Sequence, residues 1–393
     1  MKTVRLRPGR ERPLLRRHPW VFEGGIERGK ADAGETVRVE ASDGRFLAWA
    51  AYSPASAIRL RAWSFEESER IDASLFRRRI AKAVEARMRL GIDSDALRLV
   101  HGEADGLPGL VVDRYADVLC VQFGAAGVER WKGAIVDALA AECGSHRIYE
   151  RSDASVRGLE GLEPCTGWLL GDGGTDVQIR EHAWRFTVDV AHGHKTGLYL
   201  DQRDNRRRFA GLVRQLRLRR VLNAYSYTGG FSVAALAGGA EHVTSVDSSG
   251  PALERAVEHV ARNGHAAERH EARDADVNRT LREAVSRAER WDAIVLDPPK
   301  LAPTSAHAER AARAYKDINR LALAALAPGG LLLTFSCSGG VGVELFHKIV
   351  AGAAIDAGVD GAIVERLGAA PDHPMTLLFP EGEYLKGLAI VRT

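Results

Sequence analysis

The chain has few cysteines and no long apolar run. Its four cysteines, Cys120, Cys143, Cys165 and Cys337, are scattered over 393 residues, and none are paired at Cys-x-x-Cys spacing. This pattern argues against a zinc site and is typical of a protein from a reducing compartment. No stretch approaches the length of a membrane span, and the basic N-terminus lacks the apolar core of a signal peptide. We therefore expect a soluble, cytoplasmic protein with no bound metal ion and no membrane partner.

The net charge is small, but the basic residues are unevenly placed. Lysine and arginine total 55 against 52 acidic residues, and this balance of +3 identifies no class of partner. Within residues 1–22, one acid, Glu11, stands against seven basic residues: Lys2, Arg5, Arg7, Arg10, Arg12, Arg16 and Arg17. A cluster of this kind is typical of a surface that contacts phosphates, and a solvated tail is the alternative. The same two interpretations apply to the eight arginines of residues 203–220.

Hydrophobic periodicity predicts three domains. In residues 1–70, short alternating strands flank turns such as Asp43-Gly44, which predicts a small β-barrel. Residues 71–190 begin with a helical pattern and continue with mixed strands and helices, which predicts a separate α+β module. In residues 191–393, helices alternate with continuous apolar strands. Such alternation predicts an α/β domain with a parallel, doubly wound sheet.

The first two strands of this sheet carry the pattern of a nucleoside site. Residues 220–223 form the first strand and lead into a turn with two adjacent glycines. Glycines let the backbone turn tightly and approach a ligand closely. The turn residues that we expect to contact the cofactor are Tyr225, Thr228, Gly229 and Gly230. Asp247 ends the next strand 18 residues after Gly229, a spacing that suits a carboxylate binding both ribose hydroxyls.

The turn favours S-adenosylmethionine (SAM) over a nicotinamide cofactor. A dinucleotide needs three glycines as Gly-x-Gly-x-x-Gly to seat its pyrophosphate, whereas this turn has two and no basic residue. A nucleoside without phosphates fits better, and SAM is the common one. Asp274 and Asp276 follow the third strand, where an adenine amine would bind. We place Asp276 at the N-terminus of the next helix, Asp274 stays possible, and one of the two is expected to be only a helix cap.

The fourth strand ends in Asp297-Pro298-Pro299-Lys300. This run is similar to the motif with which amino-methylating enzymes hold an exocyclic amine, using an acid or amide and proline carbonyls. In those enzymes the fourth residue is an aromatic that stacks on the base, whereas here it is Lys300. The departure weakens an N-methylation interpretation, which stays as the alternative.

Cys337 offers a different chemistry. It follows the fifth apolar strand, in the run Phe335-Ser336-Cys337-Ser338-Gly339. Carbon 5 of a pyrimidine is a poor nucleophile, and a thiolate that adds to carbon 6 makes it enamine-like and able to accept a methyl group. The thiol must be ionised to act. A helical pattern follows Cys337, and we expect the N-terminus of that helix to favour the thiolate.

These motifs identify a resemblance to the RlmI-type cytosine-C5 methyltransferases of bacterial large-subunit ribosomal RNA. In the C-terminal half it rests on residues 193–204, Ser226-Tyr227-Thr228-Gly229-Gly230-Phe231, Asp297-Pro298-Pro299-Lys300, residues 315–319, residues 335–339 and Tyr384-Leu385-Lys386-Gly387. Residues 14–22 and 51–54 look like the PUA domain of that family, a small RNA-binding barrel, and residues 151–153 look like its middle module. The likeness therefore covers nearly the whole chain.

The resemblance implies a class I (Rossmann-like) methyltransferase domain, SAM as donor, ribosomal RNA as partner, 5-methylcytosine as product and often a homodimer. It makes Cys337 the nucleophile. The base that removes the carbon-5 proton is not identified, and Asp297 and Lys300 are the nearest candidates. Gln202 is expected to line the cofactor pocket or to position the substrate. A non-catalytic RNA-binding protein is the remaining alternative, although the cofactor and cysteine motifs are complete.

Overall fold

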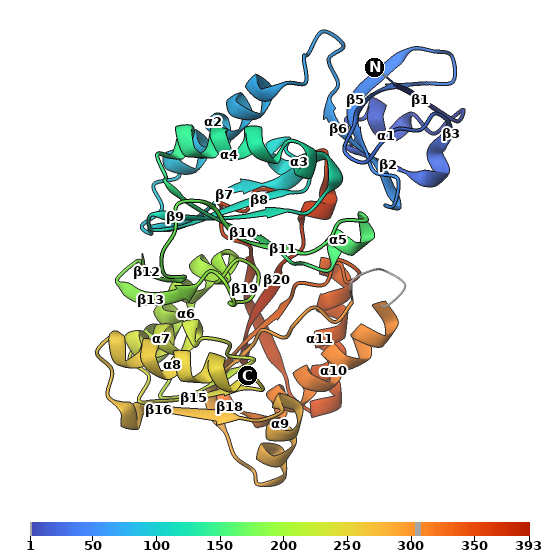
Figure 1. The fold of residues 1–393 in the computed structure, drawn as a ribbon. Helices are drawn as coiled ribbons and strands as arrows, with labels where there is room; N and C mark the ends of the chain where they lie inside the picture. The colour runs from blue at the N-terminus through green and yellow to red at the C-terminus, as the bar shows by residue number, and fades with distance from the viewer. Residues whose placement is uncertain (1, 303–307) are drawn as a thin grey trace. The chain divides into compact units, whose positions relative to one another are not determined.

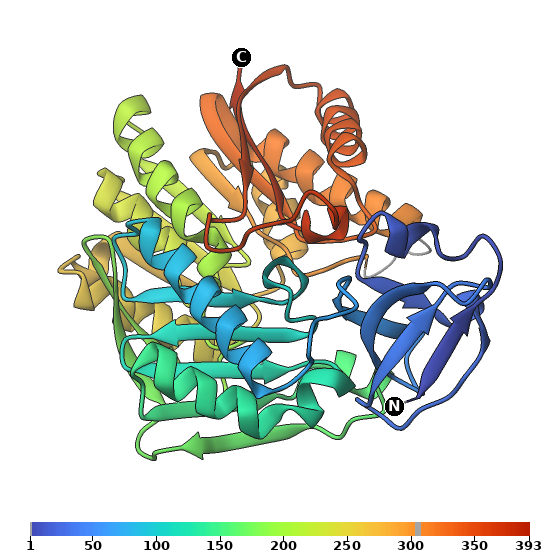
Figure 2. The same cartoon turned by 90° about the horizontal axis from the view of Figure 1, so that it is seen from above.

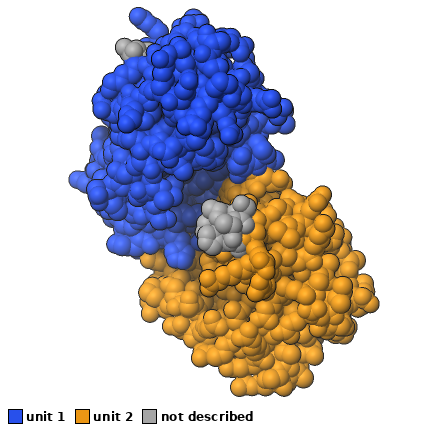
Figure 3. Space-filling view, turned by 90° about the vertical axis from the view of Figure 1, so that its right-hand side faces the viewer, with its two compact units in different colours: residues 1–181, 188–200, 371–382 blue, residues 182–187, 201–370, 383–393 orange. Residues whose placement is uncertain are grey.

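The computed structural model describes residues 2–302 and 308–393 (Figure 1). The chain divides into two compact units, coloured separately in Figure 3. Unit 1 comprises residues 1–181, 188–200 and 371–382, and unit 2 comprises residues 182–187, 201–370 and 383–393. The expected domain boundaries at residues 70 and 190 stay a prediction, because the barrel and the middle module share one unit and the chain returns to that unit near its end.

The N-terminal part of unit 1 is a six-stranded sheet in the order β2-β6-β5-β4-β1-β3. Its strands are β1 (Thr3–Leu6), β2 (Trp20–Phe22), β3 (Ile26–Arg28), β4 (Thr36–Glu40), β5 (Phe46–Tyr52) and β6 (Ile58–Ser64). Their inward side chains, among them Val4, Val37, Leu47 and Leu60, form a core of their own. The short helix α1 (Arg12–Leu15) contributes Leu14 to that core and leaves its arginine exposed. The strand and turn signals of residues 36–63 are thus found as expected.

The remainder of unit 1 is built on a five-stranded sheet in the order β11-β10-β9-β8-β7. Its strands are β7 (Ala96–His101), β8 (Leu110–Tyr115), β9 (Val118–Phe123), β10 (Arg147–Ser152) and β11 (Cys165–Leu170). Helices α2 (Ala73–Arg89) and α4 (Lys132–Cys143) lie across one face of this sheet (Figure 2). Asp72 caps α2 by accepting from two backbone amides, and Phe76 and Ile80 then point into the sheet. Two short helices are α3 (Ala126–Arg130) and α5 (Val156–Leu159), and a separate two-stranded sheet pairs β12 (Asp176–Glu181) with β13 (Trp184–Asp189), most of which belongs to unit 2.

Unit 2 contains a seven-stranded sheet in the order β16-β15-β14-β17-β18-β20-β19. Its strands are β14 (Arg220–Ala224), β15 (His242–Asp247), β16 (His270–Asp274), β17 (Trp291–Leu296), β18 (Leu326–Ser336), β19 (Gly361–Gly368) and β20 (Lys386–Arg392). The first five in chain order run parallel, as expected. The last strand is antiparallel to both β18 and β19, so the sheet is mixed rather than wholly parallel.

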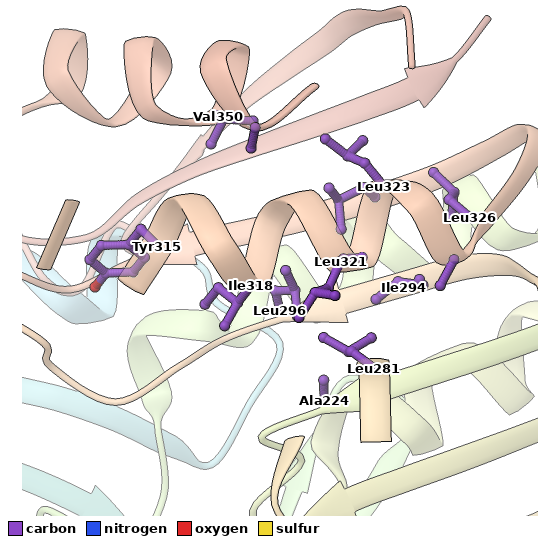
Figure 4. Close-up of a cluster of buried hydrophobic side chains, with 14 of the residues drawn as sticks. Ala224, Leu281, Ile294, Leu296, Tyr315, Ile318, Leu321, Leu323, Leu326 and Val350 are labelled. Carbon is purple, nitrogen blue, oxygen red and sulfur yellow. The ribbon is translucent and has the colours of Figure 1, made fainter. Parts of the chain in front are cut away.

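The helices of unit 2 are α6 (Arg203–Leu216), α7 (Gly230–Gly238), α8 (Gly250–Arg262), α9 (Val277–Ser286), α10 (Ala308–Ala325) and α11 (Val343–Ala357). Side chains of α9, α10 and α11 pack on β14, β17 and β18 around Leu281, Ile294 and Leu321 (Figure 4). Apolar strands between helices are stable only when both faces are covered in this way. Helix α10 ends at Ala325, and Pro328-Gly329-Gly330 lies within the long strand β18 instead of directly ending the helix.

The arginine-rich segment after residue 202 is not a solvated helix. Arg203 is fully buried and Arg206 is 3% exposed, although both belong to the very polar helix α6. Arg207 and Arg208 of the same helix are exposed. The sequence pattern alone does not separate these two faces, because arginine is a rare core residue.

Candidate active site

The glycine turn between β14 and α7 is a strained, tightly packed loop. Tyr225, Tyr227 and Gly229 have positive φ angles of 58°, 46° and 75°. A side chain at Gly229 would place its Cβ 2.8 Å from the Cβ of Ala256 in α8. Such backbone conformations are sparsely populated for residues other than glycine, and they cluster at ligand sites. The turn therefore requires glycine at this position both for its conformation and for its approach to α8.

A buried histidine that the sequence did not single out supports this turn. His259 of α8 is fully buried, and its Nδ1 lies 2.8 Å from the carbonyl oxygen of Thr228. Its Nε2 lies 2.9 Å from the amide nitrogen of Thr187, which donates to it. Burial lowers the pKa of His259, so the ring is neutral, with Nδ1 as donor and Nε2 as acceptor. The ring thereby fixes the backbone of the turn.

Asp247 is held at the end of β15 by two backbone amides. Its Oδ2 accepts from the amide of Tyr227 at 2.8 Å, and its Oδ1 accepts from the amide of Ser249 at 3.0 Å. Each carboxylate oxygen has a second lone pair, so the group can still accept bonds from two vicinal hydroxyls. The role of this carboxylate as a ribose ligand stays a prediction, and its free lone pairs are compatible with it.

Asp274 and Asp276 lie after the neighbouring strand. Asp274 is the last residue of β16 and is the register partner of Asp247. Asp276 is the N-cap of α9 and accepts from the amide of Arg279 at 2.8 Å through Oδ1. The negative charge of Asp276 also acts on Tyr225, whose pKa is raised to about 12, mainly by burial. The helix-cap role and the nearness to the glycine turn therefore fall on the same residue, Asp276.

Two further residues of the glycine turn, Thr228 and Gly230, lie against neighbouring helices. Thr228 is nearly buried and offers its carbonyl to His259. At Gly230, a Cβ would lie 2.9 Å from the Cδ of the buried Arg206. The turn contains no basic residue of its own, but α6 brings one against it. At both glycines the space that a Cβ would occupy is taken by a neighbouring helix, α8 at Gly229 and α6 at Gly230, so the turn is closely packed.

Asp297 follows β17 and forms a polar chain with α6 and the preceding turn. Gln202 donates from Nε2 to Oδ2 of Asp297 at 2.9 Å. Asn205 in turn donates from Nδ2 to Oε1 of Gln202 at 2.6 Å and to the carbonyl of Gly368 at 2.9 Å. Gln202 and Asn205 are buried, so the network holds Asp297 in one orientation. The sequence predicted Gln202 in the cofactor pocket or in a position to orient the substrate, and the structure shows its bond to Asp297.

Cys337 lies beyond the end of β18, next to the end of β17. Leu296 and Thr334 are register partners in these parallel strands, so Asp297 and Cys337 follow at the same edge of the sheet. Burial raises the pKa of Tyr315, and the charges of Cys337 and Asp297 raise it further, which places both groups close to this hydroxyl. Two motifs that are forty residues apart in sequence are thus brought together. Lys300 is exposed at the end of the proline run.

Ser338 anchors the loop that carries Cys337. Its Oγ accepts from the amides of Leu301 and Ala302 at 3.1 and 3.0 Å and lies 3.0 Å from the hydroxyl of Tyr315. The expected helix N-terminus is not at the cysteine. Helix α11 begins only at Val343, six residues further on, and a helix dipole acts mainly within the first turn. A contribution of the α11 N-terminus to the Cys337 thiolate therefore stays a prediction.

Comparison with known proteins assigns the family. The model for S-adenosylmethionine-dependent methyltransferases matches residues 134–380, and the model for PUA-like domains matches residues 4–65. The chain is 49% identical over 392 residues to ribosomal RNA large subunit methyltransferase I of Pseudoalteromonas translucida, covering 98% of each chain. The Klebsiella pneumoniae enzyme of that name is 46% identical over 391 residues, covering 98% of this chain and 96% of its own. The chain belongs to the ribosomal RNA large subunit methyltransferase I family.

Solved structures agree on the fold. A protein from Streptococcus mutans described as a SAM-dependent methyltransferase superposes with a TM-score of 0.85 at 21% identity, over all of both chains. A methyltransferase structure in complex with S-adenosylhomocysteine gives 0.87 at 21% identity, again over all of both chains. The chain is thus a SAM-dependent ribosomal RNA methyltransferase with an N-terminal PUA-like domain, as predicted, and SAM is its methyl donor. In the parts of the chain that the structure describes, no helix is long and apolar enough to cross a membrane.

Proposed function

We propose that this methyltransferase modifies carbon 5 of a cytosine in large-subunit ribosomal RNA, with Cys337 as the nucleophile. The observation that carries the proposal is the position of Cys337 beside Asp297 at the carboxyl edge of the unit 2 sheet, where ligands of such sheets bind. The other three cysteines, Cys120, Cys143 and Cys165, belong to unit 1, and burial raises the pKa of each thiol.

The roles of the residues follow from the chemistry of the pyrimidine. The Cys337 thiolate forms a bond to carbon 6, and the electron pair of the 5,6 double bond moves to carbon 5 and, through carbon 4, towards nitrogen 3 and the carbon-2 carbonyl oxygen of the cytosine. Bound SAM supplies an electrophilic methyl group that carbon 5 accepts. A base then removes the carbon-5 proton, the double bond re-forms, and the cysteine leaves as a thiolate. Asp297, held by Gln202, and the exposed Lys300 are the candidate bases.

The cofactor residues act by binding and orientation. Asp247 accepts hydrogen bonds from the ribose hydroxyls. The glycine turn lies along the ligand with Tyr225, Thr228, Gly229 and Gly230. Asp276 binds the adenine amine with Oδ2, since its Oδ1 caps α9. The nearness of its charge to Tyr225 favours it over Asp274, which remains the rival.

The RNA is held in part by unit 1. Arg10, Arg12 and Arg16 are exposed and have no carboxylate partner within residues 2–302 and 308–393. In the same unit, a cavity of about 330 Å³ is lined in part by the partly exposed Trp20, and a single unstacked base can stack on an indole of this kind. Replacing the three arginines by alanine is expected to make RNA binding less dependent on salt. The negative slope of log affinity against log salt should become shallower by up to about 3. Arg77, Arg78 and Arg89, which are exposed but paired with carboxylates, provide a matched triple control.

Product analysis tests the chemical proposal. Ribosomal RNA from cells with and without the gene is compared by bisulfite mapping and by mass spectrometry of nucleosides. One 5-methylcytosine that depends on the gene is expected. A methyl group on an exocyclic nitrogen instead would favour the amine-directed interpretation of Asp297-Pro298-Pro299. Failure of the purified protein to bind SAM would favour a non-catalytic RNA-binding protein. Cytoplasmic location and a homodimer are also proposed, and sedimentation of the purified chain tests the dimer.

A further inference from the structure

Lys386 is a buried lysine at the start of β20. Lys386 is 5% exposed, and it is the register partner of Ser336 on the antiparallel strand β18. Its Nζ donates to the carbonyl oxygen of Ser338 at 2.8 Å. Cys337 lies between these two contacts, so the lysine spans the backbone on both sides of the proposed nucleophile.

The cation lacks a carboxylate partner in the part of the chain that the structure describes. The charge of Glu383 acts on it only at a distance, as does that of Cys337, and both favour the ammonium form. The positive charge of Lys300 opposes that form. Burial lowers the pKa of Lys386. A buried ammonium without an anion is costly, because the hydration that it loses is not replaced.

We propose that Lys386 is a positioning residue that stabilises Cys337 as a thiolate and fixes the loop that carries it. The Ser338 carbonyl accepts one hydrogen bond from the ammonium, which leaves two N–H bonds and the positive charge available to the neighbouring Cys337. The thiolate is the anion that the buried cation otherwise lacks. This assignment rests on the proposed function, in which Cys337 must be ionised.

The charge and the hydrogen bond of Lys386 can be separated by substitution. Lys386→Gln keeps an N–H donor for the Ser338 carbonyl and removes the charge. Lys386→Met removes both the charge and the N–H donor but keeps an unbranched side chain that suits a buried site. It replaces the glutamine variant in the test if that variant does not fold. Lys386→Arg restores the charge. Circular dichroism and SAM calorimetry establish that each variant retains the fold and the cofactor site.

The test is the pH dependence of Cys337 alkylation by iodoacetamide, in a full-length chain with Cys120, Cys143 and Cys165 replaced by alanine. With Lys386 present, we expect a thiol that reacts at neutral pH. In Lys386→Gln and Lys386→Met, the pH midpoint of Cys337 alkylation should rise by at least about one unit. The alkylation rate at pH 7 should then fall about ten-fold or more, while the rate reached at high pH is unchanged. Lys386→Arg should recover most of the rate. Turnover should recover as pH is raised in the glutamine variant.

Identical alkylation profiles with and without the lysine charge would overturn the proposal, as would a glutamine variant with unchanged turnover at pH 7. These outcomes differ from a failure of the proposed function. If Cys337→Ala still forms 5-methylcytosine, the cysteine is not the nucleophile, whatever the alkylation profiles show.

Discussion

Gln202 donates a hydrogen bond to Asp297, with Nε2 at 2.9 Å from Oδ2. The donor comes from the turn before α6 and the acceptor from the end of β17, and they are 95 residues apart in sequence. Because Asn205 holds the other end of the amide, Gln202 can present only its N–H group to Asp297. This arrangement fixes the carboxylate beside Cys337 instead of leaving it to solvent.

We expect Gln202→Leu to lower turnover by about ten-fold or more, since a misplaced catalytic group commonly has an effect of this size. SAM affinity should change by less than about two-fold, because the bond to Asp297 is lost while Asp247 and the glycine turn are untouched. Single-turnover rates and calorimetry measure the two effects. Arg207→Ala, a change of an exposed residue on the neighbouring helix α6, is the control. Loss of SAM binding without loss of the chemical step would instead place Gln202 in the cofactor pocket.

Asp247→Asn tests the ribose contact with the least damage to the turn. The amide oxygen can still accept from the amide of Tyr227, but the charge is lost and one oxygen becomes a donor group. Charge-assisted hydrogen bonds contribute about 1.5–3 kcal/mol each, so SAM affinity should fall by about ten-fold to a hundred-fold. Asp247→Ala should have a larger effect. Near-normal affinity in a folded alanine variant, measured by calorimetry, would remove Asp247 from the site.

The two roles of Asp276 can be separated. Asp276→Ser retains a good helix cap but is too short to reach an adenine, whereas Asp276→Ala removes both functions. Both variants should bind SAM more weakly, and only the alanine variant should lose about 1 kcal/mol of stability through the cap. Calorimetry and urea unfolding report these quantities. If Asp276→Ser binds SAM normally and Asp274→Ser does not, Asp274 is the adenine ligand.

His270 predicts a loss of stability in mild acid. Burial, with a smaller effect of His242, lowers its pKa to about 4, and its Nε2 lies 2.8 Å from Oγ of Ser245. The unfolded chain takes up a proton near pH 6.5, and the folded chain does so only near pH 4, so stability is lost as pH falls through that window. At pH 5 the loss from this group is about 2 kcal/mol.

Urea unfolding at pH 7.5 and pH 5 measures this loss. The difference between the two pH values should be smaller in His270→Gln than in the unmodified chain, and His146→Gln, a change of an exposed histidine, should leave it unchanged. Burial also lowers the pKa of His259 and His265. These two residues therefore contribute the same loss of stability in acid to the unmodified chain, His270→Gln and His146→Gln. An equal pH dependence in His270→Gln would show that the ring is protonated in the folded chain.

The sequence predicted the parts of the fold that local pattern determines. The strand signals of residues 36–63 are found in β4, β5 and β6, and β15 ends at Asp247 as expected, whereas the binding of SAM by the glycine turn and Asp247 stays a prediction. The sequence did not predict what depends on distant partners. The antiparallel direction of β20 follows from its pairing with β18 and β19, and no periodicity within one strand records the direction of its neighbour.

The polar residues that were missed share a physical cause. Arginine and lysine are usually surface residues, so the sequence does not indicate that Arg203, Arg206 and Lys386 are buried. Their burial is possible only because tertiary contacts compensate for it. His259 was overlooked as one of 13 histidines, although its helical spacing places it with the buried residues Leu253, Ala256 and Val260. The motif Tyr384-Leu385-Lys386-Gly387 was noticed, but a role for its lysine required the position of the Ser338 carbonyl.

The central claim is covalent catalysis by Cys337, and trapping tests it most directly. RNA with 5-fluorocytosine at the target position cannot lose a proton from carbon 5, so the adduct should persist. We expect a complex that survives denaturing gels, requires SAM, forms with Cys120, Cys143 and Cys165 replaced, and is absent in Cys337→Ala and Cys337→Ser. No adduct in the unmodified chain, together with near-normal 5-methylcytosine formation by Cys337→Ala, would contradict the account.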